Sequence, residues 1–232
     1  IQDLLAAFGE DLPFIVIEFG NEYNLHPEWF DGDINNWYRM LEDAGKKVKE
    51  IAPKVRISTT YGGGQLPSVD ILNRIPSVDI WGMNIYANDN PSFVIDHARP
   101  LLADPRLKRK DIKFYISETG ADSFNAMTGK VDEKMQAEAN VRIWNYLLEK
   151  ADTQIILGVM YMGWMDEWYK TGNPLSHDTF GVKMDVAGDG VMNDEFWGFV
   201  DIDGKPRETY FAMQEAWTGT RSLSQPASVW VL

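Results

Sequence analysis

Five apolar runs that alternate with helical segments constrain the fold of this 232-residue chain more than any other feature. The runs are apolar on both faces, and helical periodicity fills the intervals between them. Strands of this kind separated by helices are typical of a parallel sheet with helical cover. We predict strands over residues 14–19, 54–60, 78–86, 112–117 and 155–164, and helices over 2–8, 35–51, 69–75, 92–102, 133–150 and 209–217.

The number of strand–helix units suggests an incomplete barrel. A closed (β/α)8 barrel needs eight units, whereas this sequence offers five, and a long loop and one helix follow the fifth strand. We therefore predict an α/β chain that holds units four to eight of a TIM barrel within residues 1–220, with residues 221–232 as a linker or the start of a further segment. A second chain or a missing N-terminal segment would complete the barrel, and the start at Ile1 favours a processed, excised or incomplete chain.

An open, doubly wound sheet is the alternative fold. Such sheets usually carry a glycine-rich phosphate-binding turn after the first strand. The nearest candidate, Gly62-Gly63-Gly64, lacks the lysine and the helix start that such a turn needs. This alternative is therefore the weaker of the two.

Composition narrows the range of partners. The net charge of -13 would repel a nucleic acid and disfavours an anionic polysaccharide. No run of 18 apolar residues exists, so no membrane span is expected, and the absence of cysteine excludes disulfides and thiolate sites. Nine Trp and nine Tyr suit either a large aromatic core or stacking on sugar rings. We expect a secreted or periplasmic protein, although a cytoplasmic location stays open.

Two glutamates follow strand-like runs 96 positions apart. Glu22 comes after the run at 14–19, and Glu118 comes after the run at 112–117. Because the carboxyl ends of parallel strands meet at one edge of a barrel, we expect both side chains at that edge. Cleavage of a glycosidic bond needs two carboxyl groups, one to protonate the leaving oxygen and one to act at the anomeric carbon.

The pattern Asn21-Glu22, with a second glutamate three strands later, resembles clan A of the retaining glycoside hydrolases, which are (β/α)8 barrels. The resemblance extends from about residue 14 to 217. It implies that Glu22 is the general acid/base, that Glu118 is the nucleophile and that Asn21 binds the sugar 2-hydroxyl. It also implies that Tyr86 hydrogen-bonds to the nucleophile and that Trp164 forms the floor of the subsite for the cleaved sugar.

Further candidates for substrate binding come from positions near the strand ends. Asn84 shares a strand face with Tyr86 by period-two spacing. The loop after the fifth strand supplies Glu167, which also competes with Glu118 as an active carboxylate, and Trp168, which could instead pack beneath the loop. His26 and Tyr61 are candidates for lining the cleft, with a loop or core position as the alternative.

We expect no cofactor and no catalytic metal, because His26, His97 and His177 show no metal-ligand spacing. An acidic, glycine-containing loop is either solvated or a calcium site, but its spacing does not fit an EF-hand. Its carboxylates are Asp185, Asp189, Asp194 and Glu195.

These observations predict a retaining β-glycoside hydrolase that cleaves neutral β-linked oligo- or polysaccharides by double displacement. A transglycosylase would use the same residues, and a catalytically impaired carbohydrate-binding barrel is the alternative outside catalysis. A barrel enzyme that abstracts a proton would normally show metal-ligand carboxylates at successive strand ends, and this sequence does not. In clan A the first three barrel units usually add an Arg to the site, so this chain alone could be inactive.

Overall fold

The computed structural model describes residue 3 and residues 16–86 and 91–219, which fall into two compact units. Apart from residue 3, the predicted helix at 2–8 lies outside the described residues, as do the predicted linker at 221–232 and the start of the first strand. The first unit comprises Ile1–Asn84, Phe93–Ser117 and Gln154–Leu157, and the second comprises Ile85–Ser92, Glu118–Thr153 and Gly158–Leu232.

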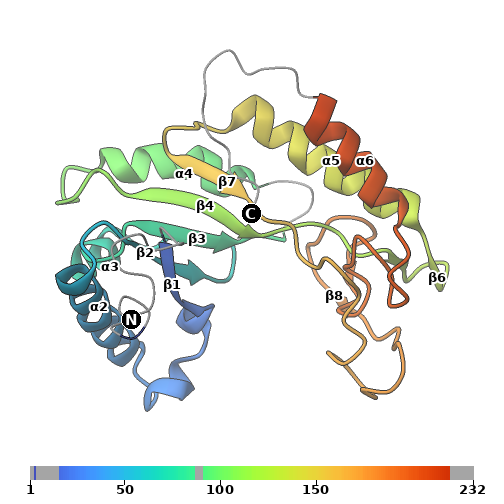
Figure 1. Cartoon of the computed structure of the whole chain (residues 1–232), viewed down its shortest axis with the longest axis horizontal. Coiled ribbons are helices and arrows are strands. Elements are labelled where there is room, and N and C mark those ends of the chain that lie inside the picture. The colour runs from blue at the N-terminus through green and yellow to red at the C-terminus, as the bar shows by residue number, and fades with distance from the viewer. Residues whose placement is uncertain (1–2, 4–15, 87–90, 220–232) are drawn as a thin grey trace. The chain divides into compact units, whose positions relative to one another are not determined.

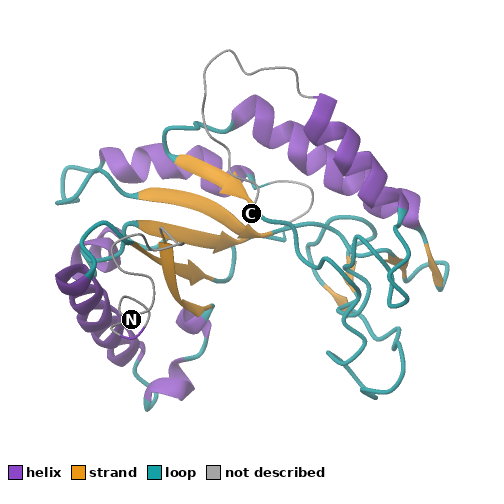
Figure 2. Ribbon diagram, in the orientation of Figure 1, coloured by secondary structure: helices purple, strands orange, loops and turns teal. Residues whose placement is uncertain are grey.

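A five-stranded parallel sheet, with the order β1-β2-β3-β4-β7, is the main β-structure (Figure 1). Each pair of consecutive strands is connected through a helix, as Figure 2 shows, which confirms the predicted α/β class with its parallel sheet. The strands are β1 (Val16–Asn21), β2 (Arg56–Tyr61), β3 (Ile80–Asn84), β4 (Lys113–Glu118) and β7 (Ile156–Val159).

Helices α2 (Ile34–Ile51), α3 (Val69–Arg74) and α4 (Ser92–Ala103) belong to the first unit apart from Ser92. Asp33 begins α2 by accepting a hydrogen bond from the amide of Asn35, which satisfies one of the free amides at the helix start. The apolar face of α2 buries Leu41 and Val48. The strands bury the side chains that complete this core, namely Ile57, Trp81, Met83, Phe114 and Ile116.

Asp79 is a buried charge that connects several elements of the first unit. Its carboxylate accepts hydrogen bonds from Lys49 of α2, from the amide of Ile57 in β2 and from Arg109. Burial acts to raise the pKa of Asp79, but these three donors outweigh burial and hold the pKa below its ordinary value. The buried carboxylate is therefore paired, as a stable interior requires.

The second unit is built on two long helices, α5 (Glu133–Lys150) and α6 (Glu208–Gly219), which pack side by side (Figure 1). Trp144, Met213 and Phe199 form the centre of its apolar core. Two short hairpins that the sequence pattern did not predict complete the unit. They are β5 (Phe124–Asn125) with β6 (Lys130–Val131), and β8 (Val182–Lys183) with β9 (Val191–Met192).

The strand predicted over 155–164 is wrong beyond Val159, where β7 ends. Gly163 has a φ of 77°, a left-handed conformation that breaks an extended strand. The carbonyls of Gly163 and Trp164 instead accept hydrogen bonds from the amides of Phe199 and Val200. Trp164 therefore lies in a loop beyond the strand end. None of the described helices combines the length and apolar character needed to cross a membrane.

Candidate active site

The end of β1 has an irregular backbone that sets the direction of Glu22. The pairing with β2 shifts register between Glu18 and Asn21, and Gly20 has a φ of 75°. Glu22 itself adopts φ 57° and ψ 20°, and its amide donates to the carbonyl of Thr60 at 3.0 Å. A left-handed conformation at a non-glycine residue is uncommon, and such strain occurs most often at functional sites. The backbone thus marks Glu22 as a candidate functional residue.

Asn84, at the end of β3, hydrogen-bonds to both Asn21 and Glu22. Its amide nitrogen donates to Oε1 of Glu22 at 2.9 Å and to Oδ1 of Asn21 at 3.1 Å. Its amide oxygen accepts from the hydroxyl of Ser117 at 2.7 Å. Asn84 is only 2% exposed, and its three hydrogen bonds go to protein atoms. Asn84 is therefore arranged to orient Glu22.

The loop after β2 lies directly against Glu22. A Cβ atom on Gly62 would come within 2.9 Å of Cγ and Cδ of Glu22, so any larger residue would displace the carboxyl group. The side chain of Asn24 holds this loop by donating to the carbonyl of Gly62 at 3.1 Å and accepting from its amide at 2.8 Å. Glu22 thus has a fixed backbone, a fixed hydrogen-bond donor and a close neighbour on the loop.

Glu118 ends β4 and is held by residues of the second unit. The hydroxyl of Tyr86 donates to Oε2 of Glu118 at 2.5 Å, and the amide of Ile85 donates to the Glu118 carbonyl at 2.8 Å. The ring of Trp197, which is 3% exposed, meets the Tyr86 ring edge-on with centroids 5.1 Å apart. The hydrogen bond that the sequence led us to expect between Tyr86 and Glu118 is present.

Asp122, four residues after Glu118, is a buried carboxyl group that sequence reasoning missed. It is 2% exposed and accepts hydrogen bonds from the amides of Phe124 and Asn193. Burial raises the pKa of Asp122 to about 7, although the two amides act in the opposite direction. This group titrates near neutral pH.

Two other predicted residues have local partners in the first unit. The hydroxyls of Tyr61 and Tyr38 lie 3.2 Å apart, and the Tyr61 ring meets Trp81 edge-on. His26 stacks on Trp29 with centroids 4.0 Å apart, and its Nδ1 lies 2.8 Å from Oε1 of Glu28. Trp29 is 58% exposed and was not predicted from the sequence.

The loop after β7 holds the remaining predicted residues. Trp164 is 64% exposed and meets Tyr210 edge-on. Glu167 forms an ion pair with Lys170 at 2.7 Å and accepts from the hydroxyl of Tyr169 at 2.9 Å. Trp168 lines a pocket in the same unit.

Glu18 is a carboxylate within β1 that sequence reasoning missed. Its Oε2 accepts hydrogen bonds from Ser58 at 3.0 Å and from Tyr115. Burial, followed by the contact with Glu18, raises the pKa of Tyr115, so its hydroxyl keeps its hydrogen at neutral pH. The only sequence signal was a charged residue inside an otherwise apolar run.

No group of three or more potential ligand side chains that could hold a metal ion occurs within residues 16–86 and 91–219. In the acidic loop, Asp189 accepts hydrogen bonds from the amides of Ala126 and Val191. Glu195 accepts hydrogen bonds from Thr171 and from the amide of Asp178. These carboxylates therefore stabilise the loop conformation.

The fold of this chain is similar to that of several solved glycoside hydrolases. It aligns with the GH39 enzyme from Xanthomonas axonopodis pv. citri at a TM-score of 0.60 and 13% identity, covering 94% of this chain and 43% of that one. It aligns with a GH2 β-galacturonidase from Eisenbergiella tayi at a TM-score of 0.59 and 14% identity, covering 95% of this chain and 36% of that one. With a β-glucuronidase from Faecalibacterium prausnitzii the TM-score is 0.53 and the identity 17%, and the alignment covers 90% of this chain and 32% of that one.

The extent of these matches limits what they show. At 13–17% identity the similarity concerns the fold alone, and the chain spans less than half the length of each of these three enzymes. No family model and no curated protein matches the sequence. The chain therefore shares the fold of part of these glycoside hydrolases.

Proposed function

We propose that this chain forms strands four to eight of a (β/α)8 barrel in a retaining β-glycoside hydrolase. The hydrogen bond from Tyr86 to Glu118 is the observation that carries this proposal, because a nucleophilic carboxylate needs a donor that stabilises and orients it. Support for the glycosidase class comes from the fold shared with solved glycoside hydrolases. A further segment or a second chain would supply the first three barrel units.

Glu118 is the proposed nucleophile. In the first step its carboxylate attacks the anomeric carbon while the bond from that carbon to the leaving oxygen breaks. The product of this step is an ester between Glu118 and the sugar. Tyr86 keeps the carboxylate in a fixed orientation, and Trp197 keeps the Tyr86 ring in place.

Glu22 is the proposed general acid/base. In the first step it gives its proton to the leaving oxygen, and in the second it removes a proton from the water that attacks the anomeric carbon. The ester to Glu118 then breaks, which releases the sugar with its original configuration and returns both glutamates to their starting states. Because Oε1 of Glu22 accepts from Asn84, we assign the transferred proton to Oε2.

The retaining geometry requires the two carboxyl groups to lie about 5–5.5 Å apart, so this spacing is a requirement of the proposal. Asn21, adjacent to Glu22, would bind the sugar 2-hydroxyl, and Trp164 would form the floor of the same subsite. The remaining candidates for contacts to the sugar chain are His26, Tyr61, Glu167 and Trp168.

We propose neutral β-linked sugars as the substrate class, in a secreted or periplasmic setting. Two of the solved enzymes named above are a β-galacturonidase and a β-glucuronidase, whose names indicate acidic sugars. The net charge of this chain is -13, which disfavours an anionic polymer. A neutral sugar avoids that repulsion.

The test uses the full-length natural protein and a panel of aryl β-glycosides that includes glucosides, galactosides and glucuronides. We expect turnover of at least one neutral glycoside and losses of roughly 1,000-fold or more in Glu22→Gln and Glu118→Gln, because each variant lacks an essential carboxyl group. Glu50→Gln is the matched control, since the exposed Glu50 side chain forms an ion pair with Lys47 on α2 and its loss should leave the rate unchanged. Equal rates in all three variants would refute the proposal.

A further inference from the structure

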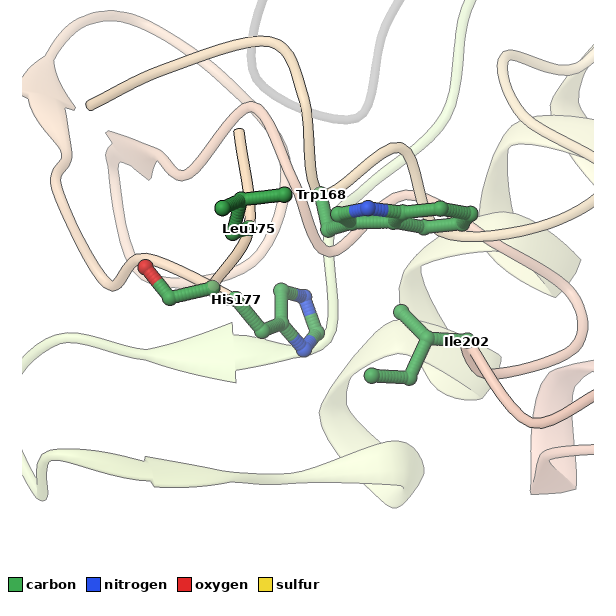
Figure 3. Close-up of a pocket in the computed structure, with 5 residues that line it drawn as sticks. Trp168, Leu175, His177 and Ile202 are labelled. Carbon is green, nitrogen blue, oxygen red and sulfur yellow. The ribbon is translucent and has the colours of Figure 1, made fainter. Parts of the chain in front are cut away.

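A pocket in the second unit lies on the loop that follows β7. Trp168, Leu175, Ser176, His177 and Ile202 line it, and its volume is about 210 Å³ (Figure 3). Sites for drug-sized ligands enclose roughly 300–1,000 Å³, so this pocket suits a group of about one ring. Figure 3 shows the indole of Trp168 on one side, with Ile202 and His177 on the other. Two largely apolar walls thus face each other across a small space.

Two polar side chains of the lining, His177 and Ser176, each have an atom that can accept a hydrogen bond. Nε2 of His177 lies 3.0 Å from the carbonyl of Glu195, and a carbonyl can only accept, so Nε2 carries the hydrogen. In the neutral ring Nδ1 is then an acceptor. The hydroxyl of Ser176 lies 3.3 Å from the carbonyl of Asn173 and 3.2 Å from Oδ1 of Asp178. The single hydroxyl hydrogen can be donated to one of those oxygens, and the hydroxyl oxygen can still accept.

No charged side chain lines this pocket. Asp166 is a carboxylate close to the His177 ring, with its Oδ2 3.5 Å from Nε2. Asp166 is buried and pairs with Arg207 at 2.5 Å, so its charge is already compensated. An anionic ligand would therefore enter the pocket without a cation to neutralise it, which is costly.

The walls of the pocket are held in place before any ligand binds. The His177 ring stacks on Phe196 with centroids 3.8 Å apart. Glu195, which is 0% exposed, accepts hydrogen bonds from the amide and hydroxyl of Thr171 and from the amide of Asp178. These bonds hold the loop between 171 and 178. A pre-formed site loses less entropy on binding than a mobile one.

We propose that this pocket binds one neutral pyranose ring. The apolar C–H face of the ring would stack on the Trp168 indole, its other face would contact Ile202, and its hydroxyls would donate to Nδ1 of His177 and Oγ of Ser176. Binding here is separate from the chemistry proposed for Glu22 and Glu118, and it would add a contact for a polymeric substrate or product.

The test uses fluorine NMR to measure binding to the full-length protein labelled with 5-fluorotryptophan. The resonance of Trp168 is assigned as the one that disappears in Trp168→Phe. The probes are methyl β-D-glucopyranoside, methyl β-D-galactopyranoside, methyl β-D-glucuronide and phenol. We expect a saturable shift of the Trp168 resonance with at least one neutral glycoside, a much weaker effect of the glucuronide and none of phenol. In Trp168→Ala the affinity for that glycoside, followed by calorimetry, should fall about tenfold or more.

Two controls separate this pocket from the proposed catalytic residues. Trp29→Ala removes an exposed indole of the first unit and should leave the Trp168 shift unchanged. The double variant Glu22→Gln/Glu118→Gln should also keep the shift, whether or not the wild-type protein turns over any substrate. No shift with any neutral glycoside would overturn the proposal. A shift with phenol alone would show that the pocket binds aromatic rings and not sugars. Equal binding of the glucuronide would show that the pocket does not select neutral sugars. Either result refutes the proposal.

Discussion

The phenol of Tyr86 donates to Oε2 of Glu118 at 2.5 Å, while the buried Trp197 ring meets the Tyr86 ring edge-on. A hydrogen bond to a carboxylate is roughly twice as strong as one between neutral groups. The donor therefore restricts the carboxylate to one orientation.

Removal of this donor should slow catalysis without unfolding the protein. We expect Tyr86→Phe to lower kcat roughly 10- to 100-fold, because a hydrogen bond to a charged group contributes ~1.5–3 kcal/mol. Steady-state kinetics on the preferred aryl glycoside would measure the loss. Tyr161→Phe is the matched control, since Tyr161 donates to the carbonyl of Asn140 in the same unit. It should reduce stability and leave kcat unchanged; an equal loss of kcat in both variants would contradict the assignment.

Asn84 should matter most when protonation of the leaving group is difficult. It donates to Oε1 of Glu22, so Asn84→Ala should disturb the proton donor and lower kcat/KM for phenyl glycosides about tenfold. For 2,4-dinitrophenyl glycosides the loss should be small, because that leaving group departs without a proton. The measurement compares the loss of kcat/KM in Asn84→Ala for the phenyl glycoside with the loss for the 2,4-dinitrophenyl glycoside.

Asn73→Ala is the matched control for this prediction. Asn73 also makes two side-chain hydrogen bonds in the first unit, to the carbonyl of Arg106 and from the amide of Lys108. Its loss should affect both substrates equally and weakly. The same equal effect in Asn84→Ala would indicate that Asn84 has a purely structural role.

The regular elements were predictable because they depend on local periodicity. The helices predicted over 35–51 and 133–150 span Ile34–Ile51 and Glu133–Lys150. The fifth strand was predicted too long because Met162, Gly163 and Trp164 continue an apolar run. Nothing in that run encodes the left-handed conformation of Gly163 or its hydrogen bond from Phe199.

The site was predictable only in part, for a similar reason. The resemblance to clan A led us to expect the hydrogen bond from Tyr86 to Glu118, and it is present. The left-handed conformation of Glu22 and the contact of Gly62 with its side chain depend on backbone geometry that residue types do not specify. The contact of Tyr115 with Glu18 joins residues 97 positions apart and has no local signal.

Asp79 should contribute strongly to stability at neutral pH. Asp79→Asn removes the charge that pairs with Lys49 and Arg109, and we expect a loss of about 3 kcal/mol in the free energy of unfolding. Because the pKa of Asp79 is lowered in the folded state, its contribution is present above the ordinary pKa of an aspartate. It is lost as the pH falls through the lowered value.

Urea unfolding of both proteins at neutral and acidic pH would measure this effect. The difference in unfolding free energy between the wild-type protein and Asp79→Asn should be smaller at acidic pH than at neutral pH. Asp111→Asn is the control, since Asp111 pairs with the same Arg109 but is largely exposed, so its loss should cost no more than about 1 kcal/mol. A similar cost for the two variants would show that burial of Asp79 is unimportant.

Asp122 should produce the opposite pH dependence. Its folded-state pKa is about 7, against an ordinary value of 3.8, so the folded protein binds more protons than the unfolded chain between these values. Stability should therefore fall as the pH rises from about 3.8 to about 7. The side chain in Asp122→Asn cannot ionise. The unfolding free energy of this variant should therefore fall less steeply than that of the wild-type protein as the pH rises across this range. An unchanged slope would refute this account of Asp122.

The rescue of alanine variants by azide tests the central claim, the assignment of Glu118 as nucleophile and Glu22 as acid/base, most directly. The full-length Glu118→Ala variant should regain turnover of an activated aryl β-glycoside with azide and form the α-glycosyl azide, because azide replaces the missing nucleophile. Glu22→Ala should form the β-glycosyl azide, because azide then attacks the ester to Glu118. Proton NMR of the products distinguishes the two anomers. The same anomer from both variants, or an α-azide from Glu167→Ala, would contradict the assignment.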